Sequence, residues 1–331
     1  MQLINGIERL PEIQAPLCLA LGNFDGVHRG HQAILRSAVE AAEQRNGCSA
    51  ALVFDPHPVV ALRPDQPLSL LTDIADRAEI MSSLGLDYLV VEPFNRTLAS
   101  LSPEQFVRQI LVEKMNAGCV FIGENYSFGN QGSGSAETLK YWGEKLGFAV
   151  RVIPMHYYAG KEVSSSKIRS LLLSGAVREA ADMLNYYFFR QGKVIRGYGI
   201  GKEKVYPTAN IITSPRLLWP GKGVYLTAVE NLDSTPFFGV TNIGSQPTFS
   251  HHDTTVETHI FDFNGTIYNY EIRLCFLEKL RDTRTFASAE QLKEQIGRDI
   301  EVGLKIIEDL RKGKNGRSYS LQSGCSVLKS Q

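Results

Sequence analysis

The hydrophobic pattern of the chain changes near residue 185, and this change constrains the fold more than any other feature. Before it, short apolar runs alternate with segments whose apolar residues recur at helical spacing. After it, strand-like runs follow one another with Gly, Pro, Asn or Asp between them. We therefore expect two domains of different class, at residues 1–185 and 186–312, and a polar, disordered tail at 313–331.

The first half has the pattern of an α/β domain. Near-continuous apolar runs predict strands at 17–22, 50–54, 87–94, 119–123 and 149–155. Helices are predicted from Gly30 onward and over 102–115, where Ser102 is the expected cap. This alternation predicts a Rossmann-like parallel sheet covered on both faces, with its ligand site at the carboxyl ends of the strands.

The second half has the pattern of an antiparallel barrel. Strands are predicted at 223–232, 237–244, 254–263 and 270–277, separated by turn-forming residues. A closing helix is predicted over 289–312, because Leu292, Ile296, Ile300 and Leu304 recur on one face.

Composition excludes several classes of protein. Lys plus Arg and Asp plus Glu both number 35, so the formal net charge is zero and no basic excess indicates a nucleic-acid partner. The start of the chain lacks the pattern of a signal peptide, and no apolar run approaches the length needed to span a membrane. The five cysteines form no C-x-x-C pair and are expected to be reduced thiols. We expect a cytoplasmic protein without membrane partners; its oligomeric state does not follow from the sequence.

The stretch "LALGNFDGVHRGHQAIL" is the first candidate site. Gly22 and Gly26 allow the backbone to approach a ligand closely, and a helix beginning near Gly30 would present free amides to it. With His28 and His31, the loop offers several donors to phosphate oxygens, and imidazolium groups would stabilise charge on a phosphorus under attack. Two alternatives are a helix-capping histidine and a pair of metal ligands.

The segment "VSSSKIRSLL" is a second candidate phosphate site. Ser165 and Ser166 would cap a helix whose first turns carry the cation Arg169, an arrangement suited to the outer phosphates of ATP. The alternative is a plain helix cap followed by a surface arginine.

The barrel half contains a third candidate site. In "GYGIGKEKVYPTANI", Thr208 and Asn210 alternate to one side of an extended run, and their oxygens suit Mg²⁺ that carries ATP phosphates. In "TVETHIFDF", alternation separates Glu257 from the Val256 side of the strand, so its carboxylate could point into the mouth of the barrel and accept a hydroxyl proton. The alternatives are a satisfied strand start and an exposed, ion-paired glutamate.

"HRGH" and "VSSSKIRSLL" resemble two motifs of the nucleotidyltransferase superfamily. Together with "FDPHP", "GENYSFG", "PTAN" and "VETH", they resemble the prokaryotic bifunctional riboflavin kinase/FMN adenylyltransferase family over nearly the whole chain. The resemblance implies a nucleotidyltransferase domain followed by a riboflavin kinase barrel with a C-terminal helix. It also implies ATP-dependent phosphorylation of riboflavin to FMN and adenylylation of FMN to FAD, with Mg²⁺ serving both steps.

The resemblance implies roles for individual residues. Asn125 would contact the flavin, His57 and Phe128 would shape its pocket, and Glu257 would be the base for the riboflavin hydroxyl. The residues expected to bind ATP in the first domain are Gly22, Asn23, Phe24, Asp25, His28, His31, Ser165, Ser166 and Arg169.

The chain departs from the family pattern in the barrel half, where Lys204, Val205 and Gln246 replace the usual leucine, glycine and arginine. Two other functions are compatible with parts of the sequence. One is a nucleotidyltransferase with another acceptor, such as a pantetheine or glycerol phosphate. The other is a flavin-binding regulator without catalysis.

Overall fold

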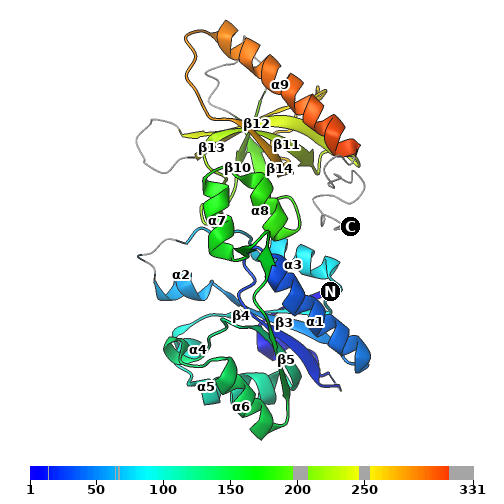
Figure 1. The fold of residues 1–331 in the computed structure, drawn as a ribbon, viewed down its shortest axis with the longest axis vertical. Coiled ribbons are helices and arrows are strands. Elements are labelled where there is room, and N and C mark those ends of the chain that lie inside the picture. The colour runs from blue at the N-terminus through cyan, green and yellow to red at the C-terminus, as the bar shows by residue number, and fades with distance from the viewer. Residues whose placement is uncertain (14, 64, 66–67, 197–207, 246–253, 313–331) are drawn as a thin grey trace. The chain divides into compact units, whose positions relative to one another are not determined.

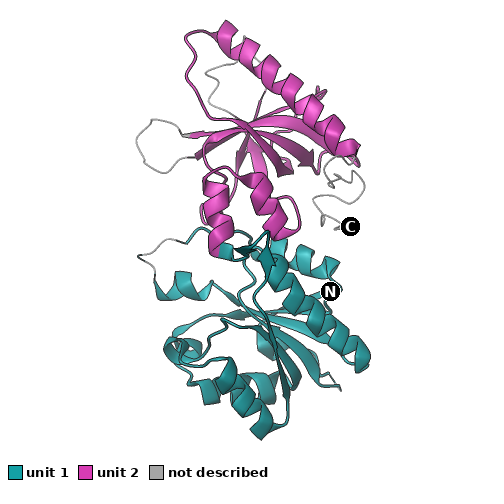
Figure 2. Ribbon diagram, in the orientation of Figure 1, with its two compact units in different colours: residues 1–165 teal, residues 166–331 magenta. Residues whose placement is uncertain are grey.

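The computed structural model describes the chain except for residues 14, 64, 66–67, 197–207, 246–253 and 313–331. It divides into two compact units, Met1–Ser165 (unit 1) and Ser166–Gln331 (unit 2), shown in Figure 2. The division lies earlier than the predicted boundary at 185, because helix α8 (Val177–Leu184) packs on strand β14 (Glu271–Arg281) of unit 2.

Unit 1 is built on a six-stranded parallel sheet, which confirms the predicted class (Figure 1). The strand order is β1-β4-β3-β2-β5-β6. The strands are β1 (Gln2–Asn5), β2 (Leu17–Leu21), β3 (Ser49–Asp55), β4 (Tyr88–Pro93), β5 (Ala117–Gly123) and β6 (Ala149–Ile153). Every residue of β2 is buried, so the strand before the histidine loop lies at the centre of the core.

Helices connect the strands of unit 1. They are α1 (Arg29–Gln44), α2 (Pro58–Leu62), α3 (Ile74–Ser83), α4 (Arg96–Ala99), α5 (Pro103–Gln105), the π-helix η2 (Phe106–Lys114) and α6 (Ala136–Leu146). Two short 3₁₀ turns, η1 (Ile7–Arg9) and η3 (Asn130–Gly132), and the hairpin β7 (Tyr157–Tyr158) and β8 (Lys161–Glu162) complete the unit. The predicted cap at Ser102 is confirmed, since Ser102 and Gln105 form a reciprocal capping box.

Unit 2 contains a closed antiparallel barrel in the order β10-β13-β12-β11-β14-β9, as predicted. Its strands besides β14 are β9 (Phe189–Ile195), β10 (Ala209–Ile212), β11 (Gly223–Glu230), β12 (Phe237–Ser245) and β13 (Thr254–Ile260). Helix α7 (Ser165–Leu173) and α8 precede the barrel, and the predicted closing helix is α9 (Ala289–Arg311).

The two faces of the barrel wall are distinguished by their packing. On the inner face, Thr241 lies within hydrogen-bond distance of two other buried hydroxyls, 2.8 Å from Thr227 and 2.9 Å from Thr258. On the outer face, α9 packs on β12 and β14, and Gly303 of α9 lies close to Leu226 of β11. A side chain of β13 therefore faces either the hydroxyl row or the exterior, according to its position in the alternation.

Two smaller expectations were also tested. Cys18, Cys48 and Cys119 are free thiols, as expected, whereas Cys275 is disulfide-bonded, so the expectation of five reduced cysteines is wrong at that position. Among the described residues, no helix is both long and apolar enough to cross a membrane.

Candidate functional site

The candidate segments of unit 1 meet at the carboxyl edge of its sheet. Gly22 follows β2, His57 follows β3 and Asn125 follows β5, and these three strands are neighbours in the order β3-β2-β5. Strands β3 and β4 lie on one side of β2, and β5 and β6 lie on the other. The direction in which successive strands are added to the sheet therefore reverses beside β2. Such a switch point is where open parallel sheets bind ligands.

His28 is the cap of helix α1. Its Nδ1 accepts a hydrogen bond from the backbone N–H of His31 at 3.3 Å, and its ring stacks on that of His31 with 3.6 Å between centroids. Gly30 leaves room for this arrangement, since a Cβ there would lie 3.3 Å from the His28 ring. The capping alternative is thus confirmed, and it leaves Nε2 of His28 for a ligand.

The two histidines are neutral in the structure, which corrects the expectation of imidazolium groups. Burial lowers the pKa of His28 to about 4. Burial, together with the neighbouring His28 and Arg77, holds the pKa of His31 well below its usual value. Because Nδ1 of His28 accepts a hydrogen bond, the proton of its neutral ring lies on Nε2. Nδ1 of His31 is buried without a hydrogen-bond partner among the described residues.

The metal-ligand alternative for the histidines has no support in the described part of the chain. There, no three His, Cys, Asp or Glu side chains form a group that could hold a metal ion.

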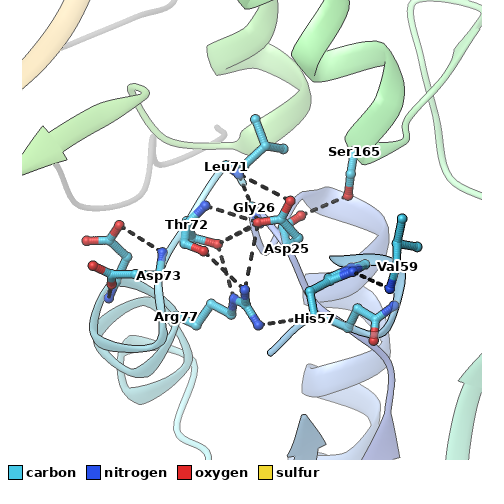
Figure 3. Close-up of polar contacts among 11 residues, drawn as sticks. Asp25, Gly26, His57, Val59, Leu71, Thr72, Asp73, Arg77 and Ser165 are labelled. Carbon is cyan, nitrogen blue, oxygen red and sulfur yellow. Dashed lines mark hydrogen bonds and ion pairs between the residues drawn. The ribbon is translucent and has the colours of Figure 1, made fainter. Parts of the chain in front are cut away.

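Asp25 anchors the histidine loop (Figure 3). Its carboxylate is 2% exposed and accepts hydrogen bonds from the backbone N–H groups of Leu71 and Thr72 at 3.0 Å. Its carbonyl oxygen accepts a hydrogen bond from the hydroxyl of Ser165 at 2.8 Å. The Asp25 carboxylate thus ties the loop to the segment before α3, and the expected contact of Asp25 with ATP stays a prediction.

The other residues of the histidine loop differ in burial and in the contacts that they make. Phe24 is fully buried and its ring packs edge-on against His31, and its expected contact with ATP stays a prediction. Gly22 lies against the same ring, which a Cβ would approach to 3.1 Å. Asn23 uses its carbonyl to accept from Arg77. Gly26 has a φ of 81°, a conformation in which a side chain would be strained.

The serine segment begins helix α7, as predicted. Ser165 lies in unit 1 and, through Asp25, contacts the histidine loop. Ser166 and Arg169 follow on the same helix within unit 2. Their contact with ATP phosphates stays a prediction.

The three residues expected on the flavin side differ in environment. His57 caps α2, with its Nδ1 accepting from the N–H of Val59 at 3.2 Å. Asn125 is exposed just beyond β5. Phe128 is 6% exposed and packs in the core between Phe106 and Tyr126. Only Asn125 is thus presented openly to solvent, and the flavin roles stay predictions.

In unit 2, register brings two of the predicted kinase residues together. Asn210 of β10 lies directly opposite Glu257 of β13, so both side chains share one face of the wall. Thr208 directly precedes β10 and is exposed. Thr258, the next residue of β13, faces the inner hydroxyl row, so Glu257 lies on the outer face. This corrects the expectation that Glu257 points into the mouth of the barrel.

Sequence reasoning missed several residues beside these sites. Asn242 of β12 lies opposite Glu257 on the side away from β10, and alternation within "FFGVTNIG" was the signal for it. His156 has its Cβ 3.6 Å from the position a Cβ would take at Gly30. Thr72 and Arg77 bind the histidine loop without any local motif. The departures at Lys204, Val205 and Gln246 lie outside the described residues.

Comparison with known proteins matches each half of the chain to a family model. The model of a family described as FAD synthetase matches residues 10–167, and that of riboflavin kinase matches residues 184–307. A solved structure titled as a macrolide-efflux protein from Streptococcus pneumoniae is 29% identical and has a TM-score of 0.80. It covers 92% of this chain and 99% of its own.

Curated relatives match over almost their full length. The bifunctional riboflavin kinase/FMN adenylyltransferase of Bacillus subtilis is 33% identical over 92% of this chain and 96% of its own. The protein of that description from Escherichia coli K12 is 32% identical over 90% of this chain and 96% of its own. With the parallel sheet, the capped histidine pair and the closed barrel, these matches show that the chain belongs to the bifunctional riboflavin kinase/FMN adenylyltransferase family.

Proposed function

We propose that the histidine loop of unit 1 is the adenylyltransferase site and that the Asn210–Glu257 row of unit 2 belongs to the kinase site. The enzyme makes FMN from riboflavin and ATP, and then FAD and pyrophosphate from FMN and ATP. The observation that supports the first assignment most is the capped helix end, where His28 and His31 stack beside the start of α1.

In the adenylyl step, an FMN phosphate oxygen attacks the α-phosphorus of ATP directly. The bond from the α-phosphorus to the bridging oxygen breaks, and pyrophosphate leaves without a covalent enzyme intermediate. The N-terminus of α1 and the Nε2–H of His28 act as neutral donors to the oxygens on which charge accumulates. Donors that are already fixed need no reorganisation during the reaction, which is why a buried, capped histidine suits this role.

Further residues complete this proposal. Ser166 and Arg169 would hold the outer phosphates, and Asn125 would bind the flavin of FMN. His57 would shape the flavin pocket from the α2 cap, with Phe128 supporting the Asn125 loop from the core.

For the kinase step, Glu257 would accept the proton of the riboflavin hydroxyl as that oxygen attacks the γ-phosphorus. Thr208 and Asn210 offer a hydroxyl and an amide oxygen, the hard donors that Mg²⁺ accepts while retaining waters. Their exposed and half-buried positions leave access for such an ion and for ATP phosphates. Bound there, Mg²⁺ would supply neutralisation of phosphate charge; orientation of the amide and carboxylate is set by β10 and β13.

Three broader expectations complete the proposal. They are a cytoplasmic location, riboflavin, FMN and ATP as partners without nucleic acid or a membrane, and a functional domain boundary near residue 185. The zero net charge favours small-molecule partners over nucleic acid. The match to the riboflavin kinase family begins at residue 184, which supports a boundary near 185.

The proposal is tested with the purified protein incubated with riboflavin, ATP and Mg²⁺, followed by chromatography. FMN followed by FAD is the expected result. No product would indicate a flavin-binding regulator, and adenylylation of pantetheine or glycerol phosphate instead of FMN would indicate another acceptor. To place the sites, His31→Ala and Glu257→Gln are compared. His31→Ala is expected to convert riboflavin only as far as FMN, and Glu257→Gln is expected to form FAD from supplied FMN but little FMN from riboflavin.

A further inference from the structure

Arg77, on helix α3, is a buried cation beside the histidine loop. Its side chain is almost fully enclosed, and the relative exposure of the residue is 2%. Figure 3 shows its guanidinium between the Thr72 segment and the loop. Its Nη1 donates to the carbonyl of Asn23 at 3.2 Å, and its Nη2 donates to the carbonyl of Thr72 at 3.1 Å. The guanidinium thus joins two chain segments that are far apart in sequence.

The hydroxyl of Thr72 extends this connection to the turn of the histidine loop. It donates to the carboxylate of Asp25 at 3.2 Å and accepts from the N–H of Gly26 at 2.8 Å. The Nε of Arg77 donates to the same hydroxyl at 3.4 Å, and its Nη2 lies 4.0 Å from the Asp25 carboxylate. The carbonyl, carboxylate and amide of residues 23, 25 and 26 are therefore all held from the start of α3.

A buried guanidinium is an expensive means of holding a loop. Removing an ion from water costs several kcal/mol even after relaxation, and apolar replacements of buried ion pairs are often as stable. A cation is retained at such a place most readily where its fixed donors or its field serve the site. The loop that Arg77 holds leads, within two residues of Gly26, to the cap His28.

We propose that Arg77 is a positioning residue for adenylyl transfer, which fixes the turn at Asn23–Gly26 so that His28 and the first amides of α1 are aimed at the phosphates of ATP. This proposal rests on the assignment of the histidine loop as the adenylyltransferase site. Arg77 acts through Asn23, Thr72 and Asp25, and the phosphates are bound by the loop.

Three variants separate the geometry from the charge. Arg77→Lys keeps the charge but loses the planar fork that serves several acceptors at once. Arg77→Met removes both charge and donors. Thr72→Val keeps the charge and shape but removes the hydroxyl that joins Arg77, Asp25 and Gly26.

A misplacement of about 1 Å can cost about 10²-fold in rate. We therefore expect kcat for FAD formation from supplied FMN to fall about 10-fold in the Lys and Val variants and about 10²-fold in the Met variant. KM for ATP should change less than kcat, because positioning acts on the reacting geometry.

The pH profile gives a readout that a purely structural role would not produce. Burial is the main cause of the low pKa of His31. The titratable His28, at the start of α1, and the charged Arg77, on α3, lower that pKa further. Removing the charge in Arg77→Met raises the pKa of His31 toward its usual value, so the loss of FAD formation at acidic pH begins at a higher pH. In Arg77→Lys and Thr72→Val the charge remains. The acidic limb of the pH profile, where FAD formation is lost as pH falls, should therefore keep its position.

Three controls complete the experiment. Arg36→Met, at an exposed position of α1, should leave kcat and the pH profile unchanged. Folding of unit 1 is followed by the fluorescence of Trp142 in a Trp219→Phe background, because the other tryptophan lies in unit 2. His31→Ala is measured in parallel, since parent FAD formation in that variant would contradict the site assignment itself.

The proposal is supported if the folded Lys and Val variants lose kcat and only the Met variant moves its acidic limb. Parent kcat in both Arg77→Lys and Thr72→Val, with His31→Ala inactive, would overturn it while leaving the site assignment intact. An acidic limb that stays in place in a folded Arg77→Met protein would also overturn it. If that variant does not fold, the kcat values of the other two still decide.

Discussion

The two candidate sites hold their polar groups in different ways. In unit 1, His28, Asp25 and Arg77 are nearly inaccessible to water, and each has hydrogen-bond partners within the protein. In unit 2, Asn210 and Glu257 are half-buried on neighbouring strands, and Thr208 is exposed beside them. The proposed adenylyltransferase site is thus held by contacts within the protein before its substrates arrive. The proposed kinase residues are placed by strand register and leave more of their surface to ligands.

The largest expected effect tests the more open site. Glu257→Gln keeps the size of the side chain but removes the proton acceptor, so FMN formation from riboflavin should fall about 10²–10⁴-fold. Steady-state rates with saturating Mg-ATP measure this. Glu271→Gln, an exposed glutamate of β14, is the matched control and should retain the parent rate. A parent rate in Glu257→Gln would reduce that carboxylate to a structural role.

The next effect tests the fixed site. His31→Ala removes the ring that stacks on His28, and loss of one such transition-state donor or its support typically costs about 10²–10³-fold. FAD formation should fall by that order while FMN accumulates from riboflavin at the parent rate, as measured by chromatography of one reaction mixture. If a folded variant lost both activities, the separation of the two sites would be contradicted.

Burial of His28 in its neutral form should make the stability of unit 1 depend on pH. Its pKa is about 4 in the folded protein, where burial is the main cause, and near 6.5 when unfolded. The unfolded state therefore takes up the proton first, and unit 1 should lose stability on the order of 3 kcal/mol as pH falls from 6.5 to 4. His28→Asn keeps a helix-capping side chain but does not titrate, so this part of the loss should disappear.

The measurement for His28 is urea unfolding, followed by Trp142 fluorescence in the Trp219→Phe background at several pH values. Above pH 7, the free energy of unfolding should change with pH in the same way in the parent protein and in His28→Asn. Below pH 6.5, it should fall more steeply in the parent protein. Parallel curves at all pH values would show that His28 is not held neutral by its surroundings.

The smallest effect concerns the boundary between the two halves. Helix α8 buries Val177, Met183 and Leu184, and it packs on β14, with Arg178 paired to Glu278. Burial of each such side chain contributes about 1.5–3 kcal/mol, which the ordering of the helix partly offsets. A fragment of residues 166–312 should therefore be about 2 kcal/mol more stable than one of residues 186–312. Urea midpoints measure the difference, and equal midpoints would favour the boundary at 185.

The sequence predicts most strongly where a local pattern and a tertiary role coincide. The buried strand β2, the helix after it and the closing helix α9 all follow from periodicity, because burial of one face imposes the spacing of apolar residues. The short edge strand β1 was missed, because it has only two apolar residues, Leu3 and Ile4, and of these only Ile4 is buried.

The details of the histidine site were less predictable. Asp25 and Thr72 meet across a large separation in the chain, and a contact of that kind leaves no periodic trace in either segment. The neutral state of the histidines depends on how deeply the loop is covered, which composition does not indicate. The outward direction of Glu257 depended on which face of β13 the barrel encloses, and alternation alone defines two faces without saying which is inside.

The hydroxyl row inside the barrel has a direction. Thr227 lies 3.3 Å from the carbonyl of Gly239 and uses its one proton there, so it can only accept from Thr241. Thr241 then has no proton left for Thr258 and must accept from it. The O–H groups of Thr258 and Thr241 therefore both point from β13 toward β11, whereas that of Thr227 points back to β12. The donor order of this row is fixed by the one bond from Thr227 to the Gly239 carbonyl. The inner wall thus ends its hydroxyl row at a backbone carbonyl, and no charged group is needed to set the order of its hydrogen bonds.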